Sequence, residues 1–228
     1  MRLWKIDLHL HSVWSYDAYS SLDMIIRACR RRQLDALALT DHNELEGALH
    51  LQERAPFKVI AGEEISTTEG EIIGLFLKER IPPEMSLQET VQAIKEQGGI
   101  VYLPHPFETV RKGVSQQSLE ALGIDQVDIW EGFNARTRDR QAVQDFWKYS
   151  DGRALKLAAG SDAHTPWELG RTYTLIQPFE SPQELLIVFD QAEFVSIPVP
   201  FIYRLVLNHK MRRYLRRIVR RNLIRGIL

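Results

Sequence analysis

The chain has 228 residues and a mass of 26.4 kDa, which suits one α/β domain with a short appendage. Hydrophobic residues make up 44% and charged residues 26%, so the composition excludes a disordered or fibrous protein. The single cysteine, Cys29, excludes a disulfide framework and a metal site built from several thiolates. No charged-then-apolar leader and no uncharged segment of the ~18 residues that a membrane helix needs is visible, so we expect a soluble, cytoplasmic protein.

Charge is distributed unevenly along the chain. The last acidic residue is Glu193, and nine of the 29 basic residues follow it, so residues 1–193 carry a net charge of about −10. An acidic body is poorly suited to binding polyanions through charge alone. It suits a site that gathers carboxylates around cations.

Short apolar runs alternate with amphipathic segments along the chain. The apolar runs predict strands at residues 3–9, 34–39, 58–65, 71–77, 100–103, 127–133, 155–159 and 171–176. The amphipathic segments predict helices at residues 21–32, 45–53, 86–97, 115–122, 138–150 and 182–192, with Ser21 and Ser86 as N-caps. Strands that alternate with helices favour a parallel α/β sheet or barrel, although residues 63–77 look like a local hairpin.

The segment Pro198-Val199-Pro200 marks a boundary between a domain at residues 1–197 and an appendage at residues 198–228. Arginine pairs at 212–213, 216–217 and 220–221 alternate with apolar residues, which predicts a basic amphipathic helix. We expect its apolar side to pack on the barrel or on another subunit. Contact with a nucleic-acid backbone and adsorption to an anionic membrane are the alternatives.

Histidines and carboxylates gather where predicted strands end. Five of the seven histidines follow predicted strands, in the motifs His9-Leu10-His11, Asp41-His42, His105-Pro106 and Asp162-Ala163-His164. In an α/β barrel these strand ends share one rim, where active sites are built. A single histidine of this kind is most often a surface or hydrogen-bonded residue, but the recurrence favours one site. Imidazoles and carboxylates without thiolates are ligands for zinc, manganese or iron.

Together these motifs resemble the PHP family, which is named for polymerase-associated and histidinol phosphatase domains. The resemblance rests on residues 7–12, 15–18, 39–43, 62–66, 105–107 and 160–164, in the family's order. It implies an α/β fold of the distorted (β/α)7 TIM-like barrel kind, followed here by the basic C-terminal helix. It also implies a cluster of two or three divalent metal ions (Mn, Zn or Fe) and hydrolysis of phosphoesters.

Carried over position by position, the resemblance implies the metal ligands His9, His11, Asp17, His42, Glu64, His105, Asp162 and His164. Many relatives have a histidine in the strand after the Glu-Ile-Ser motif, and Glu71 stands at that position here. A carboxylate also binds a hard cation, so Glu71 joins the predicted ligands and the occupancy of a third metal position stays open. Glu64 is expected to bridge two metals, and Asp41 and Glu63 to orient ligating imidazoles.

The implied reaction is the hydrolysis of a phosphoester by a water that the metal ions activate. The substrate could be a small phosphomonoester, a nucleotide or a nucleic-acid end. Asp17 and His164 are the predicted catalytic residues, since they could move protons at the leaving oxygen. The sequence contains no convincing motif for a serine or cysteine nucleophile.

A substrate phosphate also needs positively charged donors outside the metal ligands. Arg136 and Arg171 lie on or near segments expected at the same rim, so we predict that they bind substrate. Surface salt bridges are the alternative role for both. Arg111 and Lys112 are further candidates.

Two other functions fit parts of the pattern. An amidohydrolase-like hydrolase uses the same ligand types, but such enzymes typically add a bridging carbamylated lysine. No lysine stands in a suitable place at the end of a predicted strand. A non-catalytic PHP binding module would have an eroded metal site, whereas the ligand set here is nearly intact.

Overall fold

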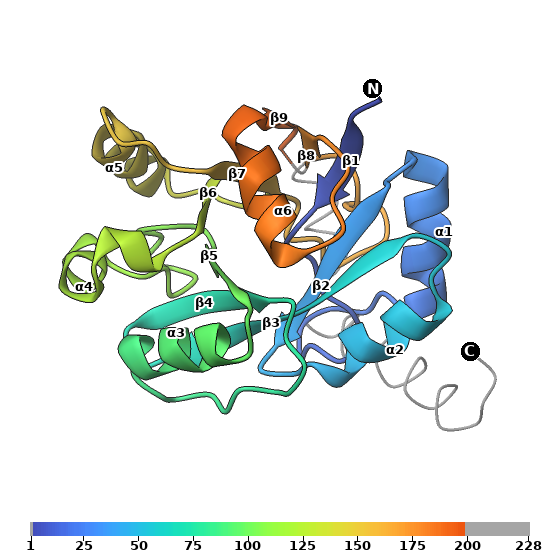
Figure 1. The fold of residues 1–228 in the computed structure, drawn as a ribbon, viewed down its shortest axis with the longest axis horizontal. Helices are drawn as coiled ribbons and strands as arrows, with labels where there is room; N and C mark the ends of the chain where they lie inside the picture. Colours follow the sequence, from blue (N-terminus) through green and yellow to red (C-terminus); the bar gives the residue numbers. More distant parts are fainter. Residues whose placement is uncertain (1, 199–228) are drawn as a thin grey trace.

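The computed structural model describes residues 2–198, so the predicted basic helix lies outside the described residues. Nine strands and six α-helices form the fold (Figure 1). The strands are β1 (Trp4–Asp7), β2 (Ala36–His42), β3 (Lys58–Thr67), β4 (Gly70–Leu75), β5 (Ile100–Leu103), β6 (Ile129–Asn134), β7 (Leu157–Gly160), β8 (Tyr173–Ile176) and β9 (Glu193–Val195). The helices are α1 (Leu22–Arg32), α2 (Glu46–Arg54), α3 (Leu87–Glu96), α4 (Gln116–Leu122), α5 (Arg140–Ser150) and α6 (Pro182–Val188).

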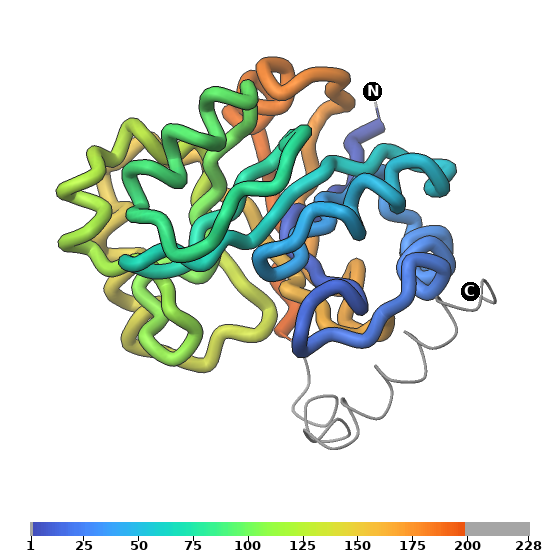
Figure 2. The backbone as a smooth tube through the Cα atoms, turned by 90° about the horizontal axis from the view of Figure 1, so that it is seen from below, coloured from blue at the N-terminus to red at the C-terminus, as the bar shows by residue number. Residues whose placement is uncertain are grey.

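All nine strands belong to one sheet, in the order β7-β6-β5-β4-β3-β2-β1-β8-β9. The sheet curves until its two ends approach each other. The backbone N–H of Ala159 in β7 donates a hydrogen bond of 3.0 Å to Oγ1 of Thr174 in β8. Figure 2 shows the backbone from a second direction, with the N-terminal segment in blue beside segments in orange from the end of the fold. The architecture is therefore a nearly closed, barrel-like mixed α/β sheet.

The sheet differs from seven repeated βα units in two places. The predicted hairpin is confirmed, because β4 runs antiparallel to β3 and also antiparallel to β5. The strand predicted at residues 171–176 is β8, but it pairs antiparallel with β1. The short strand β9, which the sequence pattern did not predict, then pairs antiparallel with β8. Local apolar pattern predicts that a segment is extended, but strand direction depends on the connections around it.

The predicted helix starts are confirmed at both serines. Oγ of Ser21 accepts a hydrogen bond of 3.3 Å from the backbone N–H of Met24. Ser86 and Glu89 form a reciprocal capping box at the start of α3. After α3 the backbone of Gly98 adopts φ +73°, a conformation that favours glycine and ends the helix.

Alternation along each strand separates an inner core from an outer core. In β6, Ile129 belongs to the inner apolar cluster, whereas Trp130 packs outward against Phe146 and Tyr149 near α5. Glu131 follows on the inner side. The inner cluster also includes Leu185 of α6, and this region lies beside the start of β3, where Lys58 contacts Glu180. Apolar residues therefore fill the end of the barrel near α6, and polar residues occupy the other end.

Within residues 2–198, no helix combines the length and the apolar composition needed to cross a lipid bilayer.

Candidate metal centre

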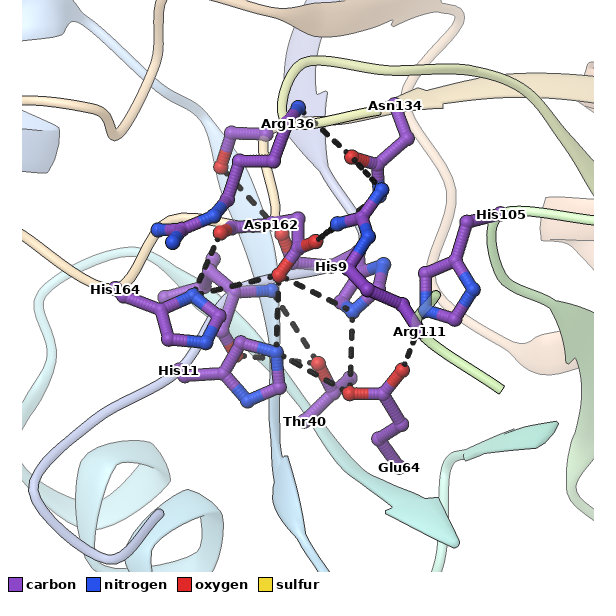
Figure 3. A network of polar contacts seen from close by, with 12 residues as sticks. His9, His11, Thr40, Glu64, His105, Arg111, Asn134, Arg136, Asp162 and His164 are labelled. Atoms are coloured by element: carbon purple, nitrogen blue, oxygen red, sulfur yellow. Dashed lines mark hydrogen bonds and ion pairs between the residues drawn. The ribbon is translucent and has the colours of Figure 1, made fainter. Parts of the chain in front are cut away.

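One rim of the sheet brings together all nine predicted metal ligands, most of them at or after the carboxyl ends of strands and Glu71 at the amino end of the antiparallel strand β4. Five histidines and four carboxylates meet there: His9, His11, Asp17, His42, Glu64, Glu71, His105, Asp162 and His164. Most of them line a cavity of about 200 Å³, and those deepest in the site are fully buried. Figure 3 shows the side chains of six of them converging from segments that are distant in the sequence, namely His9, His11, Glu64, His105, Asp162 and His164. The strand-end pattern read from the sequence therefore corresponds to one site.

Glu64 lies at the centre of this cluster. Its Oε2 atom is 3.4 Å from Nε2 of His9, 3.2 Å from Nε2 of His11 and 3.1 Å from Nδ1 of His42. Its other oxygen, Oε1, is 3.1 Å from Nε2 of His105. A carboxylate in contact with four imidazoles has the position needed to bridge two cations.

Three groups of side chains present donor atoms within 4.8 Å of one another. They are His11, His42 and His164; His9, His11 and Glu64; and Glu64, Glu71 and His105. The groups share members, as in a multinuclear metal site. These are several buried His/Glu clusters of the kind that binds zinc, manganese or iron.

Buried nitrogen and oxygen atoms without a hydrogen bond indicate whether metal ions would fit the site. Nε2 of His9, Nε2 of His11, Oδ1 of Asp17 and Oε2 of Glu64 are buried without a hydrogen bond to any described residue. Buried polar atoms nearly always have a hydrogen-bond partner, and the nitrogens of His9 and His11 lie within 3.4 Å of this Glu64 oxygen, so the three atoms suit a shared cation. Divalent cations match both the donor types and this geometry.

The site is electrostatically coupled. Burial by itself would lower the pKa of His9 and His11, but the surrounding carboxylates outweigh it. Glu64 and Glu131 raise the pKa of His9 well above its usual value, and Asp162 and Glu64 raise the pKa of His11 to about 9. Burial would raise the pKa of Glu64 and of Asp162, yet the neighbouring imidazoles, His9 foremost, lower both well below their usual values.

The pKa of Glu71 shifts in the opposite direction to that of Glu64. Burial and the adjacent Glu64 carboxylate raise the pKa of Glu71 to about 8. Its carboxylate oxygens lie 3.7 Å from Nε2 of His105 and 4.0 Å from Nδ1 of His42. Glu71 thus reaches the edge of the cluster, at the position where many relatives have a histidine.

Asp17 and His164 form a close pair at the mouth of the site. Oδ2 of Asp17 is 2.8 Å from Nε2 of His164, and Nδ1 of His164 is 2.8 Å from the backbone carbonyl oxygen of Asp162. Because a carbonyl oxygen only accepts, Nδ1 donates to Asp162, and Nε2 faces the carboxylate of Asp17 at the cavity. Burial, and then the positive charge of Arg136, lower the pKa of His164.

Glu131 supports the cluster, and the sequence interpretation missed it. Oε1 of Glu131 is 3.0 Å from Nδ1 of His9 and accepts a hydrogen bond of 2.9 Å from the hydroxyl of Tyr102. Oε2 accepts from the backbone N–H of His105 at 2.7 Å and from Nδ2 of Asn134 at 2.9 Å. The available signal was a charged residue in the middle of a strand with apolar neighbours.

Asp41 supports the opposite side of the cluster. It accepts hydrogen bonds from the backbone N–H and the hydroxyl of both Ser12 and Ser15. The Oγ atom of Ser15 in turn lies 3.1 Å from Nδ1 of His11. Asp41 therefore acts on an imidazole through a serine, in keeping with the orienting role expected for it.

Glu63 does not have the expected orienting role. Its Oε2 accepts a hydrogen bond of 2.9 Å from the backbone N–H of Ile81, and Arg80 lies 3.9 Å from Oε1. Glu63 precedes Glu64 in β3, and successive side chains of a strand point to opposite faces. Glu63 therefore holds the segment around residue 81 against the outside of the sheet.

The predicted substrate-binding arginines lie in different places. Arg136 lines the metal cavity and forms an ion pair of 2.9 Å with Glu168, which also accepts from the backbone N–H of His164. Arg171 is not among the residues that line this cavity, so its role stays a prediction. Arg111 and Lys112 do line it.

Arg111 connects several parts of the rim. Its guanidinium group forms ion pairs with Asp162 and Glu108 and donates a hydrogen bond of 2.7 Å to Oγ1 of Thr137. Another nitrogen-to-oxygen contact of 3.2 Å reaches Asn134 (Figure 3). A cation in this position compensates the charge of Asp162 and faces the same cavity as the imidazoles.

A nearly closed α/β sheet carries buried imidazoles and carboxylates at one rim, and these clusters are consistent with a multinuclear metal site. The sequence profile of the PHP domain matches residues 7–171. An uncharacterised protein of Methanocaldococcus jannaschii is 34% identical over 186 residues, which cover 79% of this chain and 75% of that protein. The chain therefore belongs to the PHP domain family, whose members are mostly metal-dependent phosphoesterases.

Two solved structures share the fold. A two-domain protein from Bacteroides vulgatus that contains a predicted PHP-like metal-dependent phosphoesterase has a TM-score of 0.66 at 20% identity, over 85% of this chain and 65% of that chain. Endonuclease Q, in complex with a duplex carrying an abasic lesion at the active site, has a TM-score of 0.65 at 14% identity, over 86% of this chain and 60% of that chain. This chain thus spans less than two thirds of either protein.

Replacing Glu131 with Gln should weaken metal binding by about 10- to 100-fold, because an amide orients the imidazole of His9 less strongly than a carboxylate does. Calorimetric titration of the metal-free protein with Mn²⁺ or Zn²⁺ measures this change. Glu120→Gln, at an exposed position of α4, is the matched control. Wild-type affinity in the Glu131→Gln protein would show that Glu131 has no influence on the metal ligands.

Gly160 makes room for the contact between Glu131 and His9. A Cβ atom at position 160 would lie 1.9 Å from Oε1 of Glu131 and 2.9 Å from Cβ of His9. We expect Gly160→Ala to reduce the free energy of unfolding by about 1–3 kcal/mol and to weaken metal binding, because the carboxylate must move.

Gly132→Ala provides the control, since the nearest atom to its added Cβ is 3.5 Å away in Leu157. Urea denaturation followed by circular dichroism measures stability, and metal titration measures affinity. Equal results for the two alanine variants would contradict the steric argument.

Proposed function

We propose that this protein is a metal-dependent phosphoesterase. The observation that carries the proposal is the convergence of five imidazoles and four carboxylates, with unpartnered donor atoms facing one another beside cationic side chains. Metal ligands alone would fit many hydrolases. The nearby guanidinium groups of Arg111 and Arg136 favour a substrate that carries negative charge, as a phosphate does.

The proposed metal ligands are those that the sequence predicts: His9, His11, Asp17, His42, Glu64, Glu71, His105, Asp162 and His164. Glu64 would bridge two of the ions, since its two oxygens face different imidazoles. Glu71 and His105 would serve a third position. Divalent cations bound there supply Lewis acidity toward phosphoryl oxygens and lower the pKa of water.

The chain's own residues would position the substrate and move protons. Arg111, Lys112 and Arg136 would hold the nonreacting phosphoryl oxygens from one side of the cavity. Asp17 and His164 lie within hydrogen-bond distance of each other at the mouth of the site. We assign to this pair the relay of the proton that the attacking water loses to the leaving oxygen.

The proposal includes several classes of substrate. Small phosphomonoesters, nucleotides and nucleic-acid ends all present a terminal phosphate that suits the cavity's cationic wall. The structural likeness to Endonuclease Q, which was solved on DNA, supports including nucleic acid among the substrates to be tested.

An amidohydrolase-like reaction has less support. Among the described residues, the lysine that lines the metal cavity is Lys112, which lies in the loop before α4 rather than in a strand. The carboxylate of Glu64 has the bridging position instead. A non-catalytic binding module is disfavoured because every predicted ligand reaches the site.

The double substitution His9→Ala and His11→Ala should abolish metal binding and phosphoesterase activity together, because it removes two donors that share Glu64. Metal content by plasma mass spectrometry and hydrolysis of 4-nitrophenyl phosphate with added Mn²⁺ measure the two effects. His50→Ala, on the exposed side of α2, is the control. Activity that survives in the double variant would place the reaction elsewhere.

Arg136→Gln should weaken the binding of inorganic phosphate by roughly tenfold, which corresponds to the loss of about 1.4 kcal/mol from one charge-assisted contact. The inhibition constant of phosphate against 4-nitrophenyl phosphate measures this effect in the Mn²⁺-loaded enzyme. Arg153→Gln, outside the cavity, is the control. An unchanged inhibition constant would remove Arg136 from the substrate contacts.

A further inference from the structure

A second cavity, of about 110 Å³, lies beside the metal centre. His105 lines both cavities, so the second one begins at a proposed metal ligand. Its outer part lies between the end of β6 and helix α5 and is lined by Phe133, Val143 and Phe146. A group attached to a phosphate at the metal centre could therefore extend into this space.

The walls of the second cavity are mainly apolar. Ala142, Val143 and Phe146 come from α5, and Phe133 comes from β6. Phe146 is held by aromatic neighbours, since its ring centroid is 6.2 Å from that of Phe107 and 6.3 Å from that of Trp130. The aromatic wall is thus fixed by packing rather than free to fill the cavity.

Apart from Nδ1 of His105, which has no hydrogen bond to a described residue, the polar side chains of this cavity already have hydrogen-bond partners. Nδ2 of Asn134 donates a hydrogen bond of 2.9 Å to Glu131 and contacts Asp162 at 3.3 Å. The hydroxyl of Thr137 donates to Glu108 at 3.0 Å. These bonds leave the cavity with little capacity to satisfy a polar ligand, and burying an unsatisfied polar group is costly.

We propose that this cavity binds the apolar ester group of the substrate, a single small ring or a branched alkyl chain. The inference rests on the proposed phosphoesterase function and narrows its substrate class. An apolar cavity of about 150 Å³ can hold benzene. The cavity here is somewhat smaller and opens to one side, so it holds one such group and not a larger polar one.

Val143→Phe tests the proposal, because it adds a ring to the cavity at a position that is 40% exposed and tolerates bulk on its open side. Binding of phenylphosphonate and methylphosphonate to the Mn²⁺-loaded protein is measured by calorimetry, which does not depend on turnover. The wild-type protein should bind phenylphosphonate about tenfold more tightly, because its ring leaves water. Val143→Phe should bind both with similar affinity, with methylphosphonate unchanged.

Leu49→Phe, a similar addition at an exposed position of α2, is the control and should keep the wild-type preference. Thermal unfolding followed by circular dichroism checks that Val143→Phe is folded, and unchanged methylphosphonate affinity checks that its metal centre is intact. If Val143→Phe lowers the affinity for both phosphonates, Ala142→Val, with a smaller addition to the same wall, replaces it.

Two results would overturn the inference while leaving the phosphoesterase proposal in place. One is equal wild-type affinity for the two phosphonates, together with Mn²⁺-dependent hydrolysis of phenyl phosphate. The other is a preference for phenylphosphonate that persists in the cavity-filling variants. Absence of both phosphonate binding and hydrolysis would instead contradict the proposed function itself.

Discussion

The burial of Glu64 among four imidazoles is the interaction on which the rest of this structure depends. Removing an isolated carboxylate from water costs several kcal/mol, and this side chain is only 1% exposed. The imidazoles of His9, His11 and His42 lie close enough to compensate that charge. Such compensation requires that strand ends from distant parts of the chain stay in register. The nearly closed sheet provides that register, because its backbone hydrogen bonds fix each strand relative to its neighbours.

A layer of residues behind the proposed ligands keeps the imidazoles from rotating. Glu131 and Asp41 each accept several hydrogen bonds, and each acts on a different histidine, the first directly and the second through Ser15. Because the supported nitrogen is Nδ1 in both cases, Nε2 faces the centre of the cluster. This is the orientation that a metal ligand needs.

The net charge of the domain and the charge at the cavity have opposite effects on an anionic ligand. The first 193 residues have an excess of acidic side chains, which repels polyanions at long range. At the rim, however, Arg111, Lys112 and Arg136 line the cavity beside the proposed metal ligands. The combination favours a phosphate group that enters the cavity over nonspecific binding of a long anionic backbone. In the proposed function, the neighbouring apolar cavity would extend this selectivity to the group attached to the phosphate.

The sequence by itself determined most of the extended and helical segments, where helices such as α3 begin, and the histidines and carboxylates that gather at the rim. These properties depend on alternation, on capping residues and on motifs at strand ends, all of which are local in the chain. Only the tertiary structure decided that β8 runs antiparallel to β1, that Glu131 supports His9 from 122 residues away, and that Gly160 leaves space for that contact. The placement of Arg111 on Asp162 and the apolar cavity beside His105 also arise from packing between distant segments. A local pattern does not encode such contacts, because they depend on how the sheet closes.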